Sequence, residues 1–187
     1  MQIVLNDQNY KKIIDKSIDV LTKGGMIVYP SDTVYGIAVD GTNAVAIKKL
    51  EDLKGRHQDQ KFSYNFSDID MVKKYLTLTE KQEKILKNNL PGSFTFVISD
   101  DASVRIPKDS IIIDITRAFG KPTTATSANL TGNDPATSIK NLHAKIYLSA
   151  DLIIEKTDFK ARKPSTLVDI KGATLKVLRE GELPFKN

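Results

Sequence analysis

The sequence MIVYPSDTVYG at residues 26–36 combines a buried-strand signal with a polar loop. Its first four residues form a continuous apolar run, which is typical of a strand buried on both faces of a sheet, and Pro30 ends that run. Two hydroxyls, a carboxylate and a phenol follow directly. Ligands of open α/β sheets usually lie at strand ends, so residues 31–36 form a candidate binding loop. An Asx-type turn made by Asp32 would explain the same residues equally well.

Helix-like and strand-like segments alternate on both sides of this stretch. Apolar residues at helical spacing predict a helix over residues 10–21, which Asn6 or Asp7 would cap. Residues 111–115 are ambiguous, because their β-branched side chains favour a strand while Gly120 provides a helix stop. Further helices are predicted after the cap Asn43 and at residues 68–75, 79–88 and 138–146, with strands at 62–66, 94–98, 103–106, 123–127, 151–155, 166–170 and 174–178.

This alternation predicts a single-domain α/β fold over residues 1–187, a twisted open sheet flanked by helices. The sheet should be mixed, because only residues 171–173 separate the last two strands. With 187 residues, 40% of them hydrophobic and 27% charged, the chain is long enough for one sizeable core. The absence of cysteine excludes a disulfide framework, thiolate catalysis and cysteine metal sites. His57 and His143 are too few for a His-rich zinc site.

Charge and hydropathy limit the partners and the location of the chain. The net charge of +5 suits ATP or RNA, although Lys-rich surfaces also serve solubility. The N-terminus has no apolar leader, and no run of eighteen apolar residues occurs anywhere. We therefore expect a cytoplasmic protein with no membrane partner.

Two short polar patterns are candidates for an anion site. Lys54 and Arg56 place two cations one residue apart at the end of a predicted helix, and Ser127 and Asn129 follow a predicted strand. Clustered cations, hydroxyls and an amide suit a small polyanion, and nucleotide phosphates are the commonest one. Taken singly, each pattern is also explained as a solvated helix end or a turn. Because the chain has no Walker-type or Gly-x-Gly-x-x-Gly run, a nucleotide would be bound by side chains from several loops.

Together these segments resemble the YrdC-like family of threonylcarbamoyl-AMP synthases. The resemblance runs from about residue 10 to residue 184, and it includes residues 29–36, 54–56, 90–95, 104–107, 126–132, 164–166 and 178–181. It implies a helix after residues 104–107, which resolves the ambiguity at residues 111–115. It also implies a nucleotidyltransferase that joins L-threonine, bicarbonate and ATP into threonylcarbamoyl-AMP and pyrophosphate, as the first step of tRNA threonylcarbamoyladenosine formation. Its partners would include tRNA and the tRNA-modification proteins, indirectly.

The resemblance also assigns roles to individual residues. Negative charge spreads over the leaving pyrophosphate, so cations and positioning supply most of the catalysis, and no general base is needed once the carbamate of threonine has formed. Magnesium would be held mainly by the nucleotide phosphates, so no residue is predicted as a metal ligand. Lys54 and Arg56 would be the catalytic cations, and Arg105 would lie nearest the carboxylate of threonine. The nucleotide set is Lys54, Arg56, Lys61, Ser127, Asn129 and Arg179, and the threonine set is Thr33, Arg105 and Ser165.

Three departures from the family pattern leave an alternative open. After Lys54-Gly55-Arg56 the family often has a Pro-Leu stretch leading to a histidine that touches threonine, whereas this chain has Asn65 there. That difference favours a YciO-type paralogue, weakly active or non-catalytic, that binds RNA or nucleotide; those paralogues often lack the Ser-x-Asn pair that is present here. The connection between residues 98 and 104 is short, and the C-terminal domain of longer homologues is not expected. A carbamoyl-transfer module of hydrogenase-maturation proteins is disfavoured by the absence of cysteine motifs.

Overall fold

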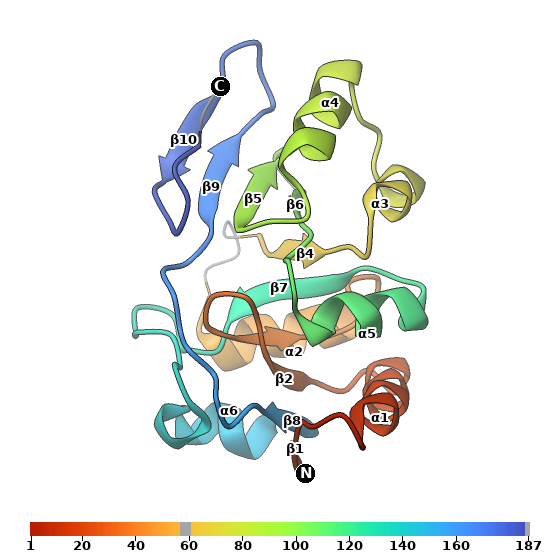
Figure 1. Cartoon of the computed structure of the whole chain (residues 1–187), viewed down its shortest axis with the longest axis vertical. Coiled ribbons are helices and arrows are strands. Elements are labelled where there is room, and N and C mark those ends of the chain that lie inside the picture. Colours follow the sequence, from red (N-terminus) through yellow and green to blue (C-terminus); the bar gives the residue numbers. More distant parts are fainter. Residues whose placement is uncertain (57–60, 186–187) are drawn as a thin grey trace.

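The computed structural model describes residues 1–56 and 61–185. Within these residues ten strands form one mixed sheet with helices packed on both faces (Figure 1). The helices are α1 (Tyr10–Thr22), α2 (Ala44–Lys54), α3 (Ile69–Tyr75), α4 (Glu80–Asn89), α5 (Ile111–Phe119), α6 (Ala144–Ser149) and the 3₁₀ turn η1 (Ile139–Asn141). The strands are β1 (Gln2–Val4), β2 (Ile27–Pro30), β3 (Tyr35–Ala38), β4 (Ser63–Asn65), β5 (Phe94–Val97), β6 (Ser103–Arg105), β7 (Thr123–Ser127), β8 (Leu152–Glu155), β9 (Thr166–Asp169) and β10 (Lys176–Arg179).

The strand order is β1-β8-β2-β3-β7-β4-β6-β5-β9-β10. Strand β7 pairs with β3 on one side and with β4 on the other, so it joins the two halves of the sheet. Parallel pairs (β1–β8, β2–β8, β4–β6 and β5–β9) occur beside antiparallel ones such as β9–β10. The predicted fold class, a single-domain α/β fold with a mixed open sheet flanked by helices, is confirmed.

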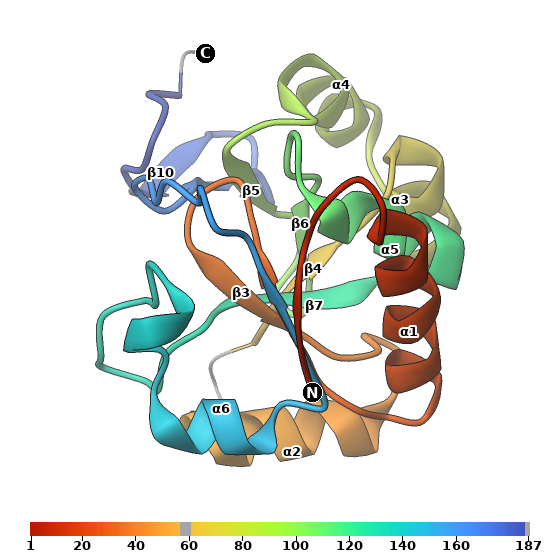
Figure 2. The same cartoon turned by 60° about the horizontal axis from the view of Figure 1, so that its bottom comes forward.

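Three apolar clusters hold the helices to the sheet. Helices α1 and α5 cover one face of the first half, where Ile27 is fully buried, and α2 and α6 cover the other face, where Val28 is fully buried (Figure 2). Strand β2 is therefore buried on both faces, as its apolar run predicted. Helices α3 and α4 pack on the second half through a separate cluster that contains Phe96 and Val104.

Residues 111–119 form helix α5, as the family resemblance implied. Its isoleucines at 111, 112 and 115 face the core at helical spacing, and Gly120 ends the helix in the left-handed conformation at φ 74°. The β-branched composition is tolerated because burial of this apolar stripe outweighs the small difference in helix propensity.

Some local predictions were wrong. The helix predicted at residues 138–146 is two short elements, η1 and α6, because the His143 side chain accepts a hydrogen bond from the Lys145 N–H and starts a new helix. The N-cap position of helix α1 is Asn9 rather than Asn6 or Asp7, and the Asn9 side chain makes no capping hydrogen bond to the helix. Instead, the Asn6 and Asn9 side chains each accept from the other residue's backbone N–H. Strands β1 and β3 were not predicted.

Candidate functional site

Strand register places polar side chains from both halves of the sheet on one face. Side chains alternate between faces along a strand, and residues paired between neighbouring strands share a face. In the second half, Phe96 and Val104 point toward α3 and α4, so their neighbours Thr95 and Arg105 point the opposite way. The paired residues of neighbouring strands that share the face of Thr95 and Arg105 are Tyr29 with Gly36, Gly36 with Ser127, Ser63 with Ala125, Asn65 with Arg105, Thr95 with Leu167 and Leu167 with Arg179.

This face carries a polar cavity of about 280 Å³. Arg56 and Ser127, which are more than seventy residues apart in the sequence, open onto the same cavity. Its lining contains seven of the nine predicted site residues, namely Thr33, Arg56, Lys61, Arg105, Ser127, Ser165 and Arg179. The cations and hydroxyls that the sequence separates are therefore brought together by the fold.

Arg56 extends into the site from the C-terminal end of α2. Gly55 ends that helix in the left-handed conformation at φ 61°, which turns the chain away directly before Arg56. The guanidinium carbon lies 4.2 Å from the centre of the Phe62 ring, and Nη1 donates to the carbonyl of Lys61 at 3.0 Å. Partial burial lowers the pKa of Arg56. The Lys61 side chain is more than half exposed and lies 4.0 Å from the carboxylate of Asp101, a solvent-screened pair that holds it only weakly.

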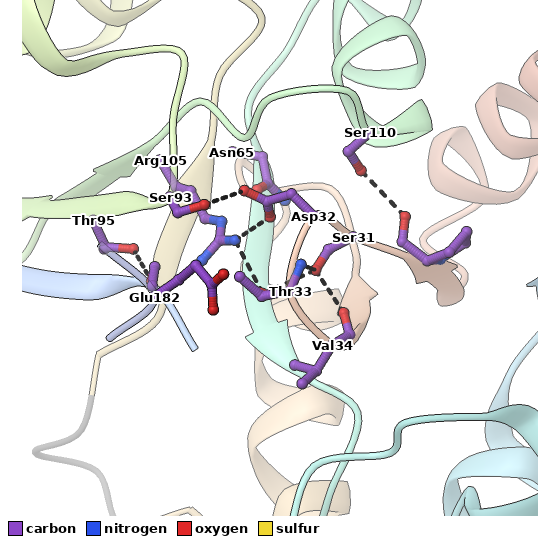
Figure 3. A network of polar contacts seen from close by, with 12 residues as sticks. Ser31, Asp32, Thr33, Val34, Asn65, Ser93, Thr95, Arg105, Ser110 and Glu182 are labelled. Carbon is purple, nitrogen blue, oxygen red and sulfur yellow. Dashed lines mark hydrogen bonds and ion pairs between the residues drawn. The ribbon is translucent and has the colours of Figure 1, made fainter. Parts of the chain in front are cut away.

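Arg105 is held by an ion pair that spans the two halves of the sheet (Figure 3). Its Nη2 donates to the carboxylate of Asp32 and to the hydroxyl of Thr33, the latter at 3.2 Å. Ser93 donates to the second carboxylate oxygen at 3.4 Å. The side chains of Arg105 and Asp32 are only 12% and 8% exposed, so the pair is buried.

Sequence reasoning missed the role of Asp32, although its carboxylate lies in the predicted binding loop. The turn is made by Ser31 instead, whose hydroxyl donates to the carbonyl of Val34 at 2.5 Å and accepts from the N–H of Thr33 at 3.1 Å. The Asx-type turn that would explain Asp32 is therefore not what the structure shows. Asp32 serves to orient Arg105.

Two buried hydroxyls and a third guanidinium complete the wall beside Arg105. Ser165 is 1% exposed, and its hydroxyl lies 2.8 Å from that of Thr95. Arg179 donates through Nη2 to the carbonyl of Ser165 at 2.9 Å. Burial lowers the pKa of Arg179, and the positive charge of Arg105 lowers it further. Two guanidinium groups thus lie close enough to repel each other, which favours an anionic ligand between or beside them.

Lys54 and Asn129 do not line the cavity, contrary to expectation. Lys54 is 3% exposed, and its Nζ donates to the carbonyls of Ser127 and Asn129 at 2.6 Å each. The Asn129 side chain accepts from the hydroxyl of Ser127 at 2.5 Å and donates to the carbonyls of Leu130 and Asn133. Both side chains hydrogen-bond to backbone carbonyls instead of facing the cavity. In this structure Lys54 and Asn129 therefore stabilise the loop that contains Ser127.

Lys54 is expected to make the stability of the fold depend on pH. Burial lowers the pKa of Lys54 from 10.5 to about 7, with a smaller contribution from the charge of Arg56. Between these values the unfolded chain binds a proton at Lys54 that the folded chain releases, so the free energy of unfolding rises with pH. This one group contributes a slope of at most about 1.4 kcal/mol per pH unit.

Denaturant titrations at several pH values between about 7 and about 10 measure this slope, because this range lies between the folded and the unfolded pKa of Lys54. The wild-type free energy of unfolding should rise relative to that of Lys54→Met, which keeps an unbranched side chain without the titrating group. Lys48→Met, which removes an exposed lysine from the same helix, is the control and should follow the wild-type slope. Parallel curves for wild type and Lys54→Met would contradict the prediction.

Asn65 occupies the position where the family pattern has histidine, and it does not line the cavity. It is fully buried, and its Nδ2 donates to the Thr124 carbonyl at 3.0 Å and to the Tyr29 hydroxyl at 3.1 Å. Over residues 1–56 and 61–185, no group of three or more His, Asp or Glu side chains is arranged to hold a metal ion. Over the same residues, no helix has the length and apolarity needed to cross a bilayer.

Comparisons with known proteins match most of this chain. The Sua5/YciO/YrdC family model, described as "Telomere recombination", matches residues 19–181. The threonylcarbamoyl-AMP synthase of Aliivibrio fischeri is 28% identical over 186 residues, which cover 91% of this chain and all of that protein. E. coli YciO superposes with a TM-score of 0.81 at 23% identity, covering 97% of this chain and 94% of its own.

A longer relative shares the fold. P. abyssi Sua5, solved in complex with L-threonine, superposes with a TM-score of 0.86 at 23% identity and covers 98% of this chain. The present chain spans only 58% of that Sua5 chain. The family model extends over most of the sequence, and so the chain belongs to the Sua5/YciO/YrdC family.

Proposed function

We propose that this protein is an L-threonylcarbamoyladenylate synthase, which makes threonylcarbamoyl-AMP and pyrophosphate from L-threonine, bicarbonate and ATP. Relatives named threonylcarbamoyl-AMP synthases support an enzyme of the nucleotidyltransferase type. The observation that carries the proposal is the convergence of Arg56, Arg105 and Arg179 on one cavity that also contains buried hydroxyls. Such a lining suits a ligand with several anionic groups.

The two sides of the cavity suit the two halves of the reaction. Arg56 and Lys61 would contact the phosphates, together with Ser127. Arg105 would bind the carboxylate of threonine, with Thr33 and Ser165 beside it. The amine of threonine would first condense with bicarbonate to a carbamate, with loss of one water. An oxygen of this carbamate would then attack the α-phosphorus of ATP and pyrophosphate would leave, while the cations stabilise the charge that develops on the leaving group.

Magnesium would enter this site with the nucleotide. Among the described residues, the lining of the cavity contains hydroxyls and cations but no carboxylate, so the phosphates would be the main magnesium ligands. When bound, magnesium would neutralise phosphate charge, and the residues of the chain would position the reactants. Lys54 and Asn129 would support the nucleotide side by fixing the Ser127 loop.

Pyrophosphate release with each reactant omitted in turn tests the proposal. We expect turnover only when ATP, L-threonine and bicarbonate are all present, and threonylcarbamoyl-AMP should be identified by mass spectrometry. Binding of nucleotide or RNA without threonine-dependent turnover would support the YciO-type alternative instead. That alternative draws on the buried position of Asn65, which takes the place of the family's threonine-contacting histidine.

The proposed cellular role is to supply the first intermediate of tRNA threonylcarbamoyladenosine formation in the cytoplasm. Because an acyl-adenylate is a reactive mixed anhydride, the proteins that transfer its acyl group to tRNA would take the product promptly. RNA would then meet this protein through those partners, with the net charge of +5 favouring the encounter.

A further inference from the structure

Tyr29 lies in the wall of the cavity, and none of the roles above uses its hydroxyl. Tyr29 is only 3% exposed, yet it lines the cavity together with Gly36, its partner in the sheet. A Cβ added at Gly36 would lie 2.6 Å from Cζ of Tyr29 and 2.8 Å from its hydroxyl oxygen. The tip of the ring therefore lies directly over Gly36, which places the hydroxyl on the cavity side of the strand pair.

Asn65 determines which way this hydroxyl can point. The carbonyl of Thr124 only accepts hydrogen bonds, so the atom of Asn65 that lies 3.0 Å from it must be Nδ2. The same Nδ2 lies 3.1 Å from the Tyr29 oxygen and 3.4 Å from the Thr123 hydroxyl. The Tyr29 oxygen therefore accepts from Asn65, and its own proton must be donated elsewhere.

Within the described part of the chain, the hydroxyl proton of Tyr29 has no hydrogen-bond acceptor. Buried polar groups in folded proteins are nearly always paired, so an unused O–H on a cavity wall indicates a ligand acceptor. Burial raises the pKa of Tyr29 to about 12, with Arg105 and the Asn65 hydrogen bond opposing the shift. The phenol is therefore protonated and able to donate at neutral pH.

We propose that Tyr29 donates this hydrogen bond to a carboxylate or carbamate oxygen of the amino-acid substrate, and that Asn65 is the positioning residue that directs it. The inference rests on the proposed function for the identity of the substrate. It gives the residue in the family's histidine position a different role, because Asn65 acts through Tyr29 rather than by contact with the ligand.

Tyr29→Phe tests the donor, because it removes one oxygen and keeps the ring over Gly36. A hydrogen bond to a charged oxygen is lost, so kcat/KM for L-threonine should fall by about 10- to 100-fold. The KM for ATP should stay within about twofold of wild type, since the phosphate side of the cavity is unchanged. Tyr64→Phe is the matched control, since Tyr64 neighbours Asn65 on β4, packs with the cluster under α3 and α4, and does not line the cavity.

Asn65→Leu tests the positioning role. It removes the donor to Tyr29, so threonine kcat/KM should fall, and the double variant Tyr29→Phe/Asn65→Leu should be no worse than Tyr29→Phe alone. This lack of additivity is specific to two residues that act through one hydrogen bond, because independent structural damage would add. Thermal unfolding of each variant is measured alongside; if Asn65→Leu does not fold, Tyr29→Phe decides the proposal alone.

An equal loss for both substrates in Tyr29→Phe, or no loss for threonine, would overturn the inference. Failure of the proposed function is seen separately, as wild-type protein that shows no threonine-dependent pyrophosphate release. In that case the twenty L-amino acids are screened by calorimetry, and Tyr29→Phe should weaken whichever one the wild type binds. If the wild type binds none of them, the inference and the proposed function are both overturned.

Discussion

Arg56→Ala is expected to lower kcat/KM for adenylate formation by about 10²–10³-fold, the usual cost of removing one preorganised donor to developing charge. Arg56 faces the cavity that also contains Ser127, and its guanidinium is fixed by the Phe62 ring and the Lys61 carbonyl. Because the group is already positioned, it can stabilise the leaving pyrophosphate without reorganisation. The measurement is pyrophosphate release at varied ATP and saturating threonine.

The same contacts predict a modest effect of Arg56→Ala on stability. Loss of the ring contact and the hydrogen bond should cost about 1–2 kcal/mol, which leaves the protein folded. Lys48→Ala is the matched control, because it removes an exposed cation from the same helix and should leave turnover unchanged. Arg56→Lys should recover only part of the activity, since an ammonium cannot bond two phosphate oxygens in one plane. An Arg56→Ala protein that fails to fold would show that Arg56 is structural.

Local signals in the sequence were enough to find the frame of the site. The apolar run ended by Pro30 identified the buried strand β2, and Gly120 ends helix α5 as predicted. Strands β1 and β3 were missed because each is short. Strand β3 also lies directly after a loop whose polar residues suggested a turn. Its place in the sheet is determined by pairing with β2 and β7, which no local pattern encodes.

Side-chain partners far apart in the sequence could not be predicted in the same way. Lys54 was expected to face phosphates, but its ammonium reaches carbonyls more than seventy residues away. The pairs Asp32–Arg105 and Tyr29–Asn65 likewise join segments that only the folded sheet brings together. Residue types and motifs predicted which segments would meet. Whether a given side chain lines the cavity or supports its wall depends on which hydrogen-bond partners the folded chain places within its reach.

Arg105→Ala is expected to reduce threonine-dependent turnover by about 10³-fold and also to destabilise the fold. The catalytic loss follows from removing the cation that would bind the substrate carboxylate. The stability loss follows because Asp32, whose side chain is 8% exposed, would be left as a buried carboxylate without its partner. Breaking a buried pair in this way costs about 3–5 kcal/mol.

A second substitution separates these two effects. Asp32→Asn in the Arg105→Ala background removes the unpaired charge, so it should restore much of the free energy of unfolding while threonine turnover stays low. Arg105→Lys should keep the ion pair and the fold but raise the KM for threonine. A guanidinium can donate to Asp32 and to a ligand carboxylate at the same time in one plane, and an ammonium cannot. Arg117→Lys, an exposed arginine paired with Asp114, is the control for an arginine-to-lysine change. If Asp32→Asn restores turnover together with stability, Arg105 acts only through the fold, and the carboxylate of the substrate must bind elsewhere.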